Sequence, residues 1–233
     1  VTGSNGFIGK NLATQLAVRG DFEILQYNRT STPDDLRLTV AEADFICHMA
    51  GVNRPDDVAE FARINTGLTE KLCQAVQDSG RQVPIIFASS DHVERNNPYG
   101  DSKLAAEQVL LKHSEKTCTP VYIFRLPRVF GKWCKPNYNS VVATFCHNIA
   151  RDLPIQIDDS PYPLSLVYID DLVATFVRIM EGKEAYKSYC EAQPSYITTL
   201  GELADQIRTF RASRGTLISE RVGDGLIRAL YAT

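Results

Sequence analysis

Three glycines spaced three residues apart, Gly3, Gly6 and Gly9, lie at the start of a helical pattern that runs from Ile8 to Arg19. Glycine at these positions permits a tight turn, lets the backbone approach a pyrophosphate and lets the helix pack closely on a strand. The phosphates then lie at the helix N-terminus, where free N–H groups and the helix dipole attract an anion. We therefore expect a dinucleotide-binding loop, with purely structural glycines as the alternative. Its predicted contacts are Gly3, Asn5, Gly6, Phe7, Ile8 and Gly9.

Apolar runs alternate with longer helical patterns over the first half of the chain, which is typical of βαβ units and a parallel sheet. Strands are expected at residues 22–27, 44–49, 83–88 and 121–126, and helices at 8–19, 56–79 and 98–113. This order predicts an α/β fold built on a doubly wound parallel sheet of the Rossmann type.

The amino-acid composition changes after Gly131: residues 132–139 are mostly polar or aromatic and contain a proline, as expected of a loop. Further on we expect a helix at 140–150, a short strand at 154–157, a helix capped by Asp170 that ends before Gly182, and a helix from the Thr199–Glu202 capping box to about Arg211. We expect residues 1–131 to bind the cofactor. Residues 132–233 then form mainly a small C-terminal substrate lobe, with some strands returning to the sheet.

Tyr99 and Lys103 are four residues apart, directly after Asn97-Pro98 and beyond Ser90. Asn at the cap and Pro at the first position favour a helix start, which places Tyr99 and Lys103 on one face. A nearby ammonium stabilises a phenolate and lowers the pKa of the phenol, so Lys103 could tune Tyr99 for proton transfer. The alternative is a solvated pair on a surface helix.

The residues after the second predicted strand bear on cofactor choice. An NAD-specific site has an acidic residue there, against the ribose hydroxyl, whereas this chain has Tyr27-Asn28-Arg29. A guanidinium matches a phosphate in a bidentate manner, so Arg29 predicts NADPH as the cofactor. A solvated loop arginine is the alternative.

Composition excludes several classes of function. The 233 residues carry a net charge of only −3 and scattered basic residues, so we expect no nucleic-acid partner. No apolar run approaches the ~18 residues of a membrane span, and no leader pattern is visible, so we expect a cytoplasmic protein that acts on small molecules. The six cysteines contain no C-x-x-C pair, and neither they nor the four histidines have the spacing of metal ligands.

The chain resembles the extended short-chain dehydrogenase/reductase family, the sugar-nucleotide epimerases and dehydratases. The motifs that carry this resemblance are the glycine loop, His48-Met49-Ala50-Gly51, Ser89-Ser90, Tyr99-x-x-x-Lys103 and Tyr168-Ile169-Asp170-Asp171. The resemblance implies Ser90, Tyr99 and Lys103 as catalytic residues, with Ser89 as an alternative to Ser90. It adds Met49, Ala50, Gly51, Tyr99 and Lys103 to the cofactor site. Asn65 matches a position that in relatives braces the site through its backbone, a plain helix-surface asparagine being the alternative.

Two further runs, Ala50 to Pro55 and Phe130 to Ser140, resemble the branch of this family that makes capsule precursors. That resemblance implies NADPH-dependent reduction of the C4 ketone of a UDP-linked 4-keto-6-deoxy amino sugar, a UDP-2-acetamido-2,6-dideoxy-4-hexulose. Tyr99 then protonates the new alkoxide and Ser90 hydrogen-bonds the same oxygen, while Lys103 holds the cofactor ribose and biases Tyr99.

The same resemblance implies a longer protein and a partner copy. Relatives have a first strand before the glycine loop, members of the capsule branch carry a C-terminal cupin domain, and both ends of this chain look cut. We therefore expect a fragment with a truncated first strand and no cupin domain. Relatives also dimerise through the helices equivalent to residues 56–79 and 98–113, so we expect a homodimer.

Recognition of the nucleotide is expected from residues that can meet a diphosphate and a uracil, because these groups need cations, amides and aromatic rings. The predicted substrate-binding residues are His92, Lys132, Lys135, Tyr138 and Asn139. The family's phosphate-binding arginine is absent from the stretch Pro163 to Leu166, and Arg151 or Arg208 could substitute for it. The loop lysines could also be solvated charges.

Other functions of the same family stay open at this point. A dehydratase needs an Asp-Glu pair after the catalytic hydroxyl, and here Ser90 is followed by Asp91 and His92, a residue that is largely neutral near pH 7. A 4-epimerase needs the same Ser, Tyr and Lys as a reductase. A non-catalytic NADP sensor usually lacks the Tyr and Lys, so their presence favours an enzyme.

Overall fold

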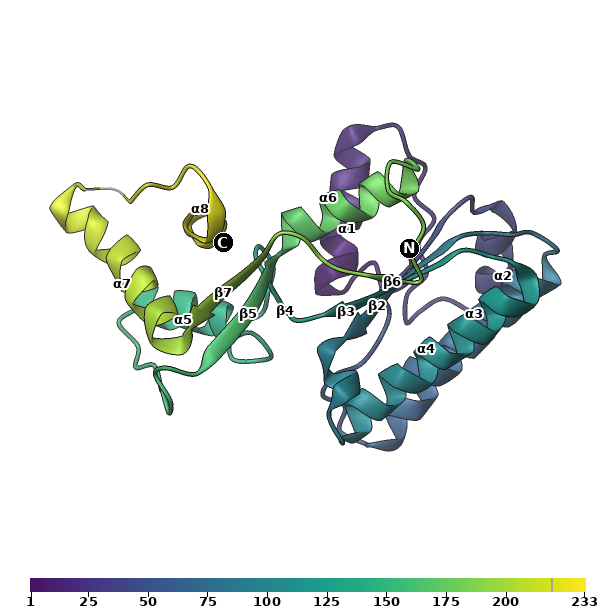
Figure 1. Cartoon of the computed structure of the whole chain (residues 1–233), viewed down its shortest axis with the longest axis horizontal. Coiled ribbons are helices and arrows are strands. Elements are labelled where there is room, and N and C mark those ends of the chain that lie inside the picture. The colour runs from purple at the N-terminus through teal and green to yellow at the C-terminus, as the bar shows by residue number, and fades with distance from the viewer. Residues whose placement is uncertain (219) are drawn as a thin grey trace. The chain divides into compact units, whose positions relative to one another are not determined.

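The computed structural model describes residues 1–218 and 220–233, and it divides into two compact units. The first unit contains Val1–Leu126 and Val173–Glu191, and the second contains Pro127–Leu172 and Ala192–Thr233. Each unit has its own sheet (Figure 1). The expected α/β fold with a parallel sheet is confirmed, while the assignment of residues 1–131 to the cofactor and 132–233 to the substrate stays a prediction.

The sheet of the first unit is parallel throughout. Its strands, in spatial order, are β1 (Ile46–His48), β2 (Ile85–Ser90), β3 (Val121–Leu126) and β6 (Tyr189–Cys190). Every residue of β1 and β2 is buried, as expected of parallel strands that helices cover on both faces. Three of the strands lie within or next to ranges predicted from sequence, and β3 has the predicted bounds.

Helices pack on both faces of this sheet. They are α1 (Phe7–Arg19), α2 (Pro33–Glu42), the π-helix η1 (Phe61–Thr66), α3 (Gly67–Asp78), the 3₁₀ helix η2 (Asp91–Glu94), α4 (Pro98–Thr117) and α6 (Ile169–Met180), of which the part from Val173 onward belongs to this unit. On one face Phe87 and Ile123 join the core formed with α3 and α4. On the other, the rings of Phe124 and Phe176 meet with centroids 5.0 Å apart. Figure 1 shows the two layers, so the sheet is doubly wound.

Local sequence explains where the functional helices begin and end. The Asn97 side chain caps α4 by accepting a hydrogen bond from the Gly100 N–H at 3.0 Å, and Pro98 occupies the first helical position. Helix α1 ends at Gly20, whose φ of 74° is easy only for glycine. The predicted start of α4 and end of α1 are confirmed.

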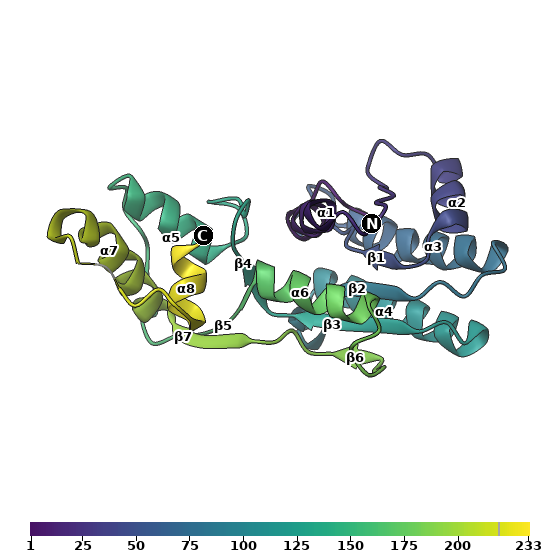
Figure 2. The same cartoon turned by 90° about the horizontal axis from the view of Figure 1, so that it is seen from above.

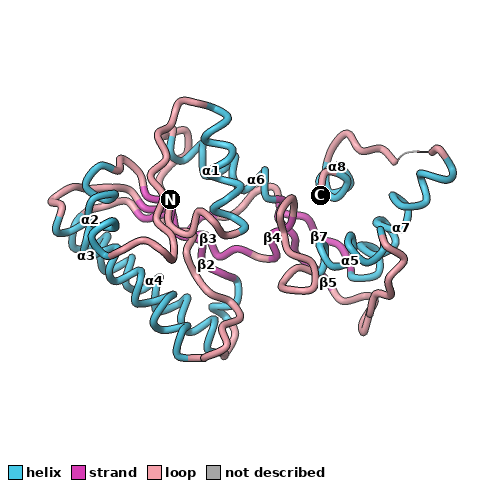
Figure 3. Tube along the Cα trace, turned by 180° about the vertical axis from the view of Figure 1, so that it is seen from behind, coloured by secondary structure: helices cyan, strands magenta, loops and turns pink. Residues whose placement is uncertain are grey.

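The structure differs from the predicted second strand and second helix. Residues 22–27 form no strand, and the whole connection between α1 and α2 is irregular (Figure 3) apart from one bridge of Tyr27 to Thr2. A strand needs a continuous partner, and among the described residues this segment pairs only with Val1 to Gly3. The helix predicted at 56–79 begins later than expected, and its first part is the π-helix η1, which continues without a break into α3. Helix α2 was missed, although Thr32 and Asp35 form a capping box around Pro33.

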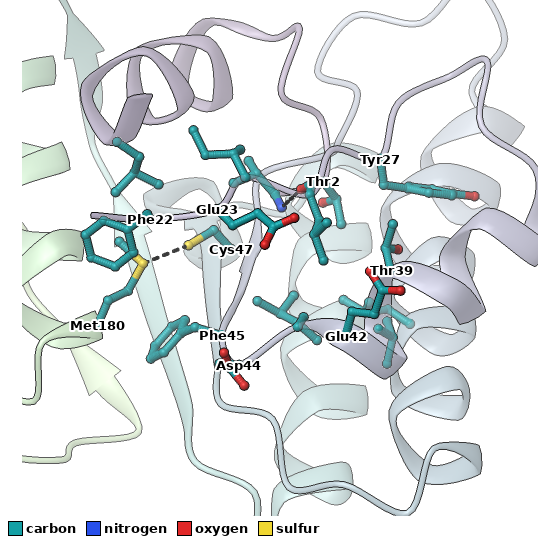
Figure 4. A pocket seen from close by; sticks show the side chains of 18 of the residues that line it. Thr2, Phe22, Glu23, Tyr27, Thr39, Glu42, Asp44, Phe45, Cys47 and Met180 are labelled. Atoms are coloured by element: carbon teal, nitrogen blue, oxygen red, sulfur yellow. Dashed lines mark hydrogen bonds between the residues drawn. The ribbon is translucent and has the colours of Figure 1, made fainter. Parts of the chain in front are cut away.

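A cavity of about 440 Å³ lies beside Val1, between the segment Asp21–Leu25 and the segment Asp44–Cys47 (Figure 4). Thr2 bridges both Tyr27 and His48 in parallel, so a strand running into Thr2 has these two segments as its neighbours. None of the residues that line the cavity is a predicted site residue. The cavity has the position expected for the family's first strand, and the presence of that strand stays a prediction.

The second unit contains a small mixed sheet and three helices. Its strands are β4 (Arg128–Phe130), β5 (Pro163–Tyr168) and β7 (Ser195–Thr199), and its helices are α5 (Val141–Ala150), α7 (Leu200–Thr216) and α8 (Gly225–Tyr231). Strand β5 pairs in parallel with β4 and antiparallel with β7. Helices α5 and α7 lie side by side (Figure 2). The predicted capping box of Thr199 and Glu202 opens α7, which continues beyond the predicted end at Arg211.

Two predictions for the second unit are wrong. Residues 154–157 form no strand, and the Pro154 carbonyl instead accepts a hydrogen bond from the Asn148 side chain at 3.0 Å. Asp170 lies inside the first turn of α6 rather than capping it, because the helix already begins at Ile169. In the part of the chain that the structure describes, no helix is both long and apolar enough to cross a membrane.

Candidate active site

Tyr99 and Lys103 lie on one face of α4, against the C-terminal end of β2. The Ser90 side chain, at the end of β2, lies beside the Tyr99 side chain and influences its pKa. The ammonium of Lys103 donates a hydrogen bond to the carbonyl oxygen of Ala88 at 2.8 Å. Ser90 and Lys103 are both buried. The three residues predicted to be catalytic are therefore neighbours in the structure.

The two adjacent serines have different partners. Successive residues of a strand point to opposite faces, so their hydroxyls meet different surroundings. Ser89 donates its hydroxyl hydrogen to the buried carboxylate of Glu107 on α4. Ser90 is the serine beside Tyr99; its hydroxyl lies 3.5 Å from the Asp91 carboxylate, and its oxygen accepts from the His92 N–H at 3.2 Å. This geometry supports Ser90, rather than Ser89, as the hydroxyl that acts with Tyr99.

Burial governs the protonation of the Tyr–Lys pair. It raises the pKa of Tyr99 above the ordinary tyrosine value; the hydrogen bond from Ser90 opposes this rise and the charge of Asp91 adds to it. Burial also lowers the pKa of Lys103 to about 8, against an opposing effect of Glu107. The expected lowering of the pKa of Tyr99 by Lys103 is not found: burial outweighs the effects that lower it. Tyr99 is therefore protonated at neutral pH and can donate a proton.

His92 lies beside Tyr99, with the ring centroids 5.5 Å apart and the rings nearly perpendicular. It belongs to η2, which follows β2 directly, and the closest approach of its Nε2 to the Asp91 carboxylate is 4.0 Å. The structure thus places His92 next to the proposed proton donor. Its predicted contact with the substrate stays a prediction.

The glycine loop can accept a pyrophosphate. Gly3 has a φ of 66°, and a Cβ there would lie 2.7 Å from the Cα of Ala50. A Cβ on Gly9 would collide with the Gly3 carbonyl group and lie 2.9 Å from the Cα of Ser4. Gly6 occupies the N-cap position of α1. Because glycine has no side chain, no capping hydrogen bond occupies the N–H groups of the first turn. The N–H groups of Phe7 and Ile8 therefore lie where an anion can reach the helix N-terminus, and this loop fits a dinucleotide.

Asn28 ties the glycine loop to the segment that carries Arg29. Its side-chain oxygen accepts hydrogen bonds from the Ser4 hydroxyl at 3.0 Å and from the Asn5 N–H at 3.2 Å. The next residue, Arg29, is exposed. Sequence reasoning missed Asn28, although it sits between the two residues used to discuss cofactor choice. Its contacts bring the predicted 2′-phosphate ligand close to the predicted pyrophosphate loop.

The residues after β1 connect the glycine loop to Lys103. The N–H groups of Met49 and Ala50 donate to the backbone oxygen and the hydroxyl of Thr2, both at 3.2 Å. A Cβ on Gly51 would lie 3.2 Å from Nζ of Lys103, so only glycine leaves this space open. Met49, Ala50 and Gly51 thus lie at the same end of the sheet as the catalytic residues, as a cofactor running from the loop to Tyr99 requires.

A neutral histidine lies beneath this end of the sheet. His48 is buried, and burial, together with the positive charge of Lys103, lowers its pKa to about 3. Its Nε2 lies 3.0 Å from the Thr69 hydroxyl, which donates its own hydrogen to the Asn65 carbonyl at 2.7 Å. Nε2 must therefore carry the ring hydrogen, and Nδ1 accepts from the Thr2 hydroxyl at 2.7 Å.

Asn65 is not a surface residue. It lies in η1 and is buried, and its side-chain oxygen accepts from the Val52 N–H at 2.8 Å. Its side-chain nitrogen donates to the Val52 carbonyl at 3.0 Å and to the Ser102 hydroxyl at 2.9 Å. Both the backbone and the side chain of Asn65 are therefore used, and the alternative of an exposed asparagine is wrong. The side chain joins the loop after Gly51 to α4.

The other predicted substrate residues belong to the second unit. The ammonium of Lys132 lies 2.7 Å from a carboxylate oxygen of Asp170, whose other oxygen accepts from the Tyr168 hydroxyl at 3.0 Å. Lys135, Tyr138 and Asn139 are exposed in the loop between β4 and α5. Their roles in substrate binding stay predictions, and Lys132 already has an acidic partner.

The two arginines suggested as replacements for the family's phosphate ligand have local partners. Arg208 lies 2.8 Å from the Asp205 carboxylate one turn earlier in α7, and Arg151 donates to the carbonyl of His147 at 3.3 Å. Another cation, Arg228 of α8, pairs with Asp171 at 3.2 Å and was not considered from sequence. The residue that meets the diphosphate stays unassigned.

Comparison with known proteins decides the family. The sequence pattern of the NAD dependent epimerase/dehydratase family matches residues 1–190. The chain belongs to this family. Within it, the chain is 51% identical over 233 residues to a curated relative, the UDP-2-acetamido-2,6-beta-L-arabino-hexul-4-ose reductase of Pseudomonas aeruginosa strain PA103. The alignment covers 100% of this chain and 63% of the length of that relative.

Solved structures of the epimerase/dehydratase family agree with this placement. The capsular polysaccharide assembling protein CapF from Staphylococcus aureus superimposes with a TM-score of 0.90 and 38% identity, covering 100% of this chain and 63% of CapF. The UDP-glucuronic acid 4-epimerase from Bacillus cereus, solved in complex with NAD, has a TM-score of 0.83 at 17% identity and covers 99% of this chain and 93% of its own. The second likeness shows the shared fold only.

Proposed function

We propose that this chain reduces the C4 ketone of a UDP-2-acetamido-2,6-dideoxy-4-hexulose, a UDP-linked 4-keto-6-deoxy amino sugar, with NADPH as the reductant. The observation that carries the proposal is the protonated Tyr99 beside Ser90, one helical turn from the buried Lys103. The likeness to a relative named as a reductase of such a 4-ketone supports the choice of substrate.

The cofactor site is built from groups at one end of the sheet. The N-terminus of α1 and the glycine loop hold the pyrophosphate, Met49 to Gly51 flank the cofactor, and Lys103 contacts the ribose. When bound, NADPH supplies a hydride to the carbonyl carbon at C4. The chain supplies everything else: it orients the ketone and provides the proton.

Tyr99 provides that proton to the C4 oxygen as negative charge develops there. A tyrosine whose pKa is raised by burial is held in the protonated form needed for donation. Ser90 hydrogen-bonds the same oxygen and holds it within reach of Tyr99. Lys103, one helical turn from Tyr99, holds the cofactor ribose and so fixes the cofactor beside Tyr99.

Several observations favour reduction over the other reactions of the family. A dehydratase needs a carboxylate where this chain has His92, which lies against Tyr99. A 4-epimerase shares the Ser90, Tyr99 and Lys103 geometry but regenerates its cofactor in each turnover. A non-catalytic sensor has no need for a buried ammonium beside a tyrosine. The experiment must therefore follow the cofactor.

We expect one NADPH to be oxidised for each molecule of UDP-4-keto-6-deoxy amino sugar consumed, because the hydride stays in the product. The measurement is the loss of absorbance at 340 nm alongside chromatography of the sugar nucleotide, with a panel of UDP-4-keto sugars. A second panel of UDP-sugars that carry a C4 hydroxyl, incubated with the oxidised cofactor, tests the alternative: interconversion of C4 epimers with no net change in the cofactor would identify an epimerase instead. NADPH binding with no turnover of any panel member would identify a sensor.

Arg29 provides a separate prediction about the cofactor. Replacing Arg29 by Asp should reverse the preference from NADPH to NADH, because a carboxylate repels the 2′-phosphate and accepts from the free ribose hydroxyl. We expect the ratio of dissociation constants for NADH and NADPH to change by about 100-fold, on the order of a charge-assisted bidentate contact. Fluorescence titration with both cofactors measures it, with the exposed Arg37→Asp as the matched control. An unchanged ratio would show that Arg29 is a solvated loop residue.

We also propose a homodimer formed through α3 and α4 and a cytoplasmic location. In the substrate lobe, the proposed nucleotide contacts are Lys132, Lys135, Tyr138 and Asn139. The homodimer rests on the resemblance to the family, the location on the lack of a membrane-span or leader pattern in the sequence, and the nucleotide contacts on the cations, amide and aromatic ring that a diphosphate and a uracil need.

A further inference from the structure

Glu107 is a buried acidic residue that sequence reasoning did not single out. It lies one helical turn after Lys103 on α4, and its exposed fraction is 0%. Its carboxylate contacts three neighbouring strands: it accepts hydrogen bonds from Ser89 of β2, Arg125 of β3 and Tyr189 of β6. A buried carboxylate raises the free energy of the folded state unless it is paired, so its partners must compensate for this cost.

Arg125 forms a close, bidentate ion pair with Glu107. Nη2 of Arg125 lies 2.8 Å from one carboxylate oxygen, and Nε lies 3.2 Å from both oxygens. Ser89 and Arg125 are direct neighbours in the ladder of β2 and β3, so both reach α4 from the same level of the sheet. The Glu107 side chain is 1% exposed and that of Arg125 is 35% exposed, so solvent reaches only the cation.

Three successive residues of β2 are linked to three successive turns of α4. The carbonyl of Ala88 accepts a hydrogen bond from Lys103, the hydroxyl of Ser89 donates to Glu107, and Ser90 lies beside Tyr99. Of these links, the one through Glu107 involves no proposed catalytic residue. It lies farthest along α4 from Tyr99 and is the only one of the three that is also anchored to β3 and β6.

We propose that Glu107 is a positioning residue of the reductase site, which docks α4 on the end of β2 and supplies the negative charge that keeps Lys103 an ammonium ion. The proposal rests on the proposed function for the meaning of that ammonium, but the contacts themselves do not. Glu107 does not touch the reacting atoms. It acts through Lys103 and through Ser89, which leaves Ser90 for Tyr99.

The groups around Lys103 make Glu107 the main opposing charge. From its own helix Lys103 faces Tyr99, which is protonated, and Glu107. From β1 it faces His48, which is neutral, and from β2 the Phe87 ring lies 4.7 Å from Nζ. Burial lowers the pKa of Lys103 and Glu107 raises it.

Arg125, Glu94 and Tyr189 influence the pKa of Lys103 mainly through their contacts with the Glu107–Arg125 pair. The positive charge of Arg125 lies farther from Lys103 than Glu107 does, and it partly cancels the effect of Glu107 on the pKa of Lys103. Glu94 lies 3.9 Å from Arg125 and is largely exposed, so solvent screens it. The Tyr189 hydroxyl donates to Glu107 and stays neutral below the ordinary tyrosine pKa, which burial raises further.

Removing the negative charge of Glu107 and removing the positive charge of Arg125 should therefore shift the pKa of Lys103 in opposite directions. In Glu107→Gln the acid is lost and Arg125 remains, so the pKa of Lys103 should fall by about 0.5 to 1 unit, the size expected for one charge about a helical turn away. In Arg125→Met the ionised acid keeps Lys103 as its nearby cation, so the pKa of Lys103 should rise, by a smaller amount because Arg125 lies farther away. In the double variant Glu107→Gln/Arg125→Met both charges are absent, and the value should return to between the two.

The measurement is an NMR titration of the Lys103 side chain in protein labelled with 13Cε-lysine, with Lys103→Arg used to assign the signal. Opposite shifts in the two single variants support the proposal. Equal values in all variants, or shifts in the same direction, would overturn it, because a purely structural role lowers stability without a sign change. If Glu107→Gln fails to fold, the double variant decides alone, because it leaves no buried charge unpaired: a pKa of Lys103 that is unchanged or raised from that of the unmodified protein contradicts the proposal.

Activity gives an independent readout. The high-pH limb of kcat/KM should follow Lys103, moving to lower pH in Glu107→Gln and to higher pH in Arg125→Met. If the unmodified protein turns over no UDP-4-keto sugar, the proposed function fails, while the NMR titration still tests the role of Glu107. If turnover is present but its pH limb does not follow the NMR titration, Glu107 does not act on the reaction through Lys103.

Discussion

Replacing Tyr99 by Phe should lower kcat by about 10² to 10⁴, the usual contribution of a positioned general acid, while changing NADPH affinity by less than about twofold. The phenylalanine ring keeps the contact with His92, whose ring centroid lies 5.5 Å from that of Tyr99, but it has no proton to give. Stopped-flow kinetics with the 4-keto sugar measures the first quantity, and quenching of protein fluorescence by NADPH measures the second.

Tyr186→Phe is the matched control, because Tyr186 is exposed and its hydroxyl meets only Ser188, at 3.1 Å, among the contacts described. It should leave kcat unchanged. Full activity in Tyr99→Phe would remove Tyr99 from the role of proton donor. Joint loss of activity and of NADPH binding would instead show that Tyr99 holds the cofactor site together, and the proton would have to come from another group.

Gly9→Ala is expected to abolish measurable NADPH binding and to lower the melting temperature. The added Cβ collides with the backbone of Gly3 and Ser4 rather than with a flexible side chain, so the glycine loop must move as a whole. Overpacking of this kind costs about 1 to 3 kcal/mol or more, and the displaced loop no longer presents the N-terminus of α1 to a phosphate. Calorimetric titration and thermal unfolding measure the two effects.

Gly215→Ala is the control for this substitution. Gly215 lies in α7, and a Cβ added there would meet no atom within 4 Å, so alanine should stabilise the helix by up to about 1 kcal/mol through its higher helix propensity. NADPH affinity should be unchanged. Wild-type affinity in Gly9→Ala would mean that the loop has room for a methyl group, and the assignment of the pyrophosphate to this loop would then fail.

Much of the fold was predictable because its signals are local. Asn97-Pro98 caps α4, Gly20 ends α1, and the Thr199 capping box opens α7, each through contacts within a few residues. The apolar run at 121–126 is β3 over the same residues. Short-range capping and a buried hydrophobic run keep their meaning in almost any tertiary setting.

The failed predictions concern features that need a partner from elsewhere in the chain. Residues 22–27 and 154–157 have apolar character, yet a strand exists only where another strand lies beside it. Glu107 is one of many helix-surface acids in the sequence, and only the arrival of Ser89, Arg125 and Tyr189 from three strands makes it a buried anchor. Spacing after Lys103 is the one signal that could have drawn attention to it.

The amino-acid sequence alone was enough to predict the alternation of strands and helices, the glycine loop before α1, and the common face of Tyr99 and Lys103. These features depend on periodicity and on contacts between residues that are close along the chain. Folding was needed to give Ser89 and Ser90 their different partners and to set the protonation of the Tyr–Lys pair. The reason is physical: burial and hydrogen-bond partners control a pKa, and both are supplied by residues far away in the chain.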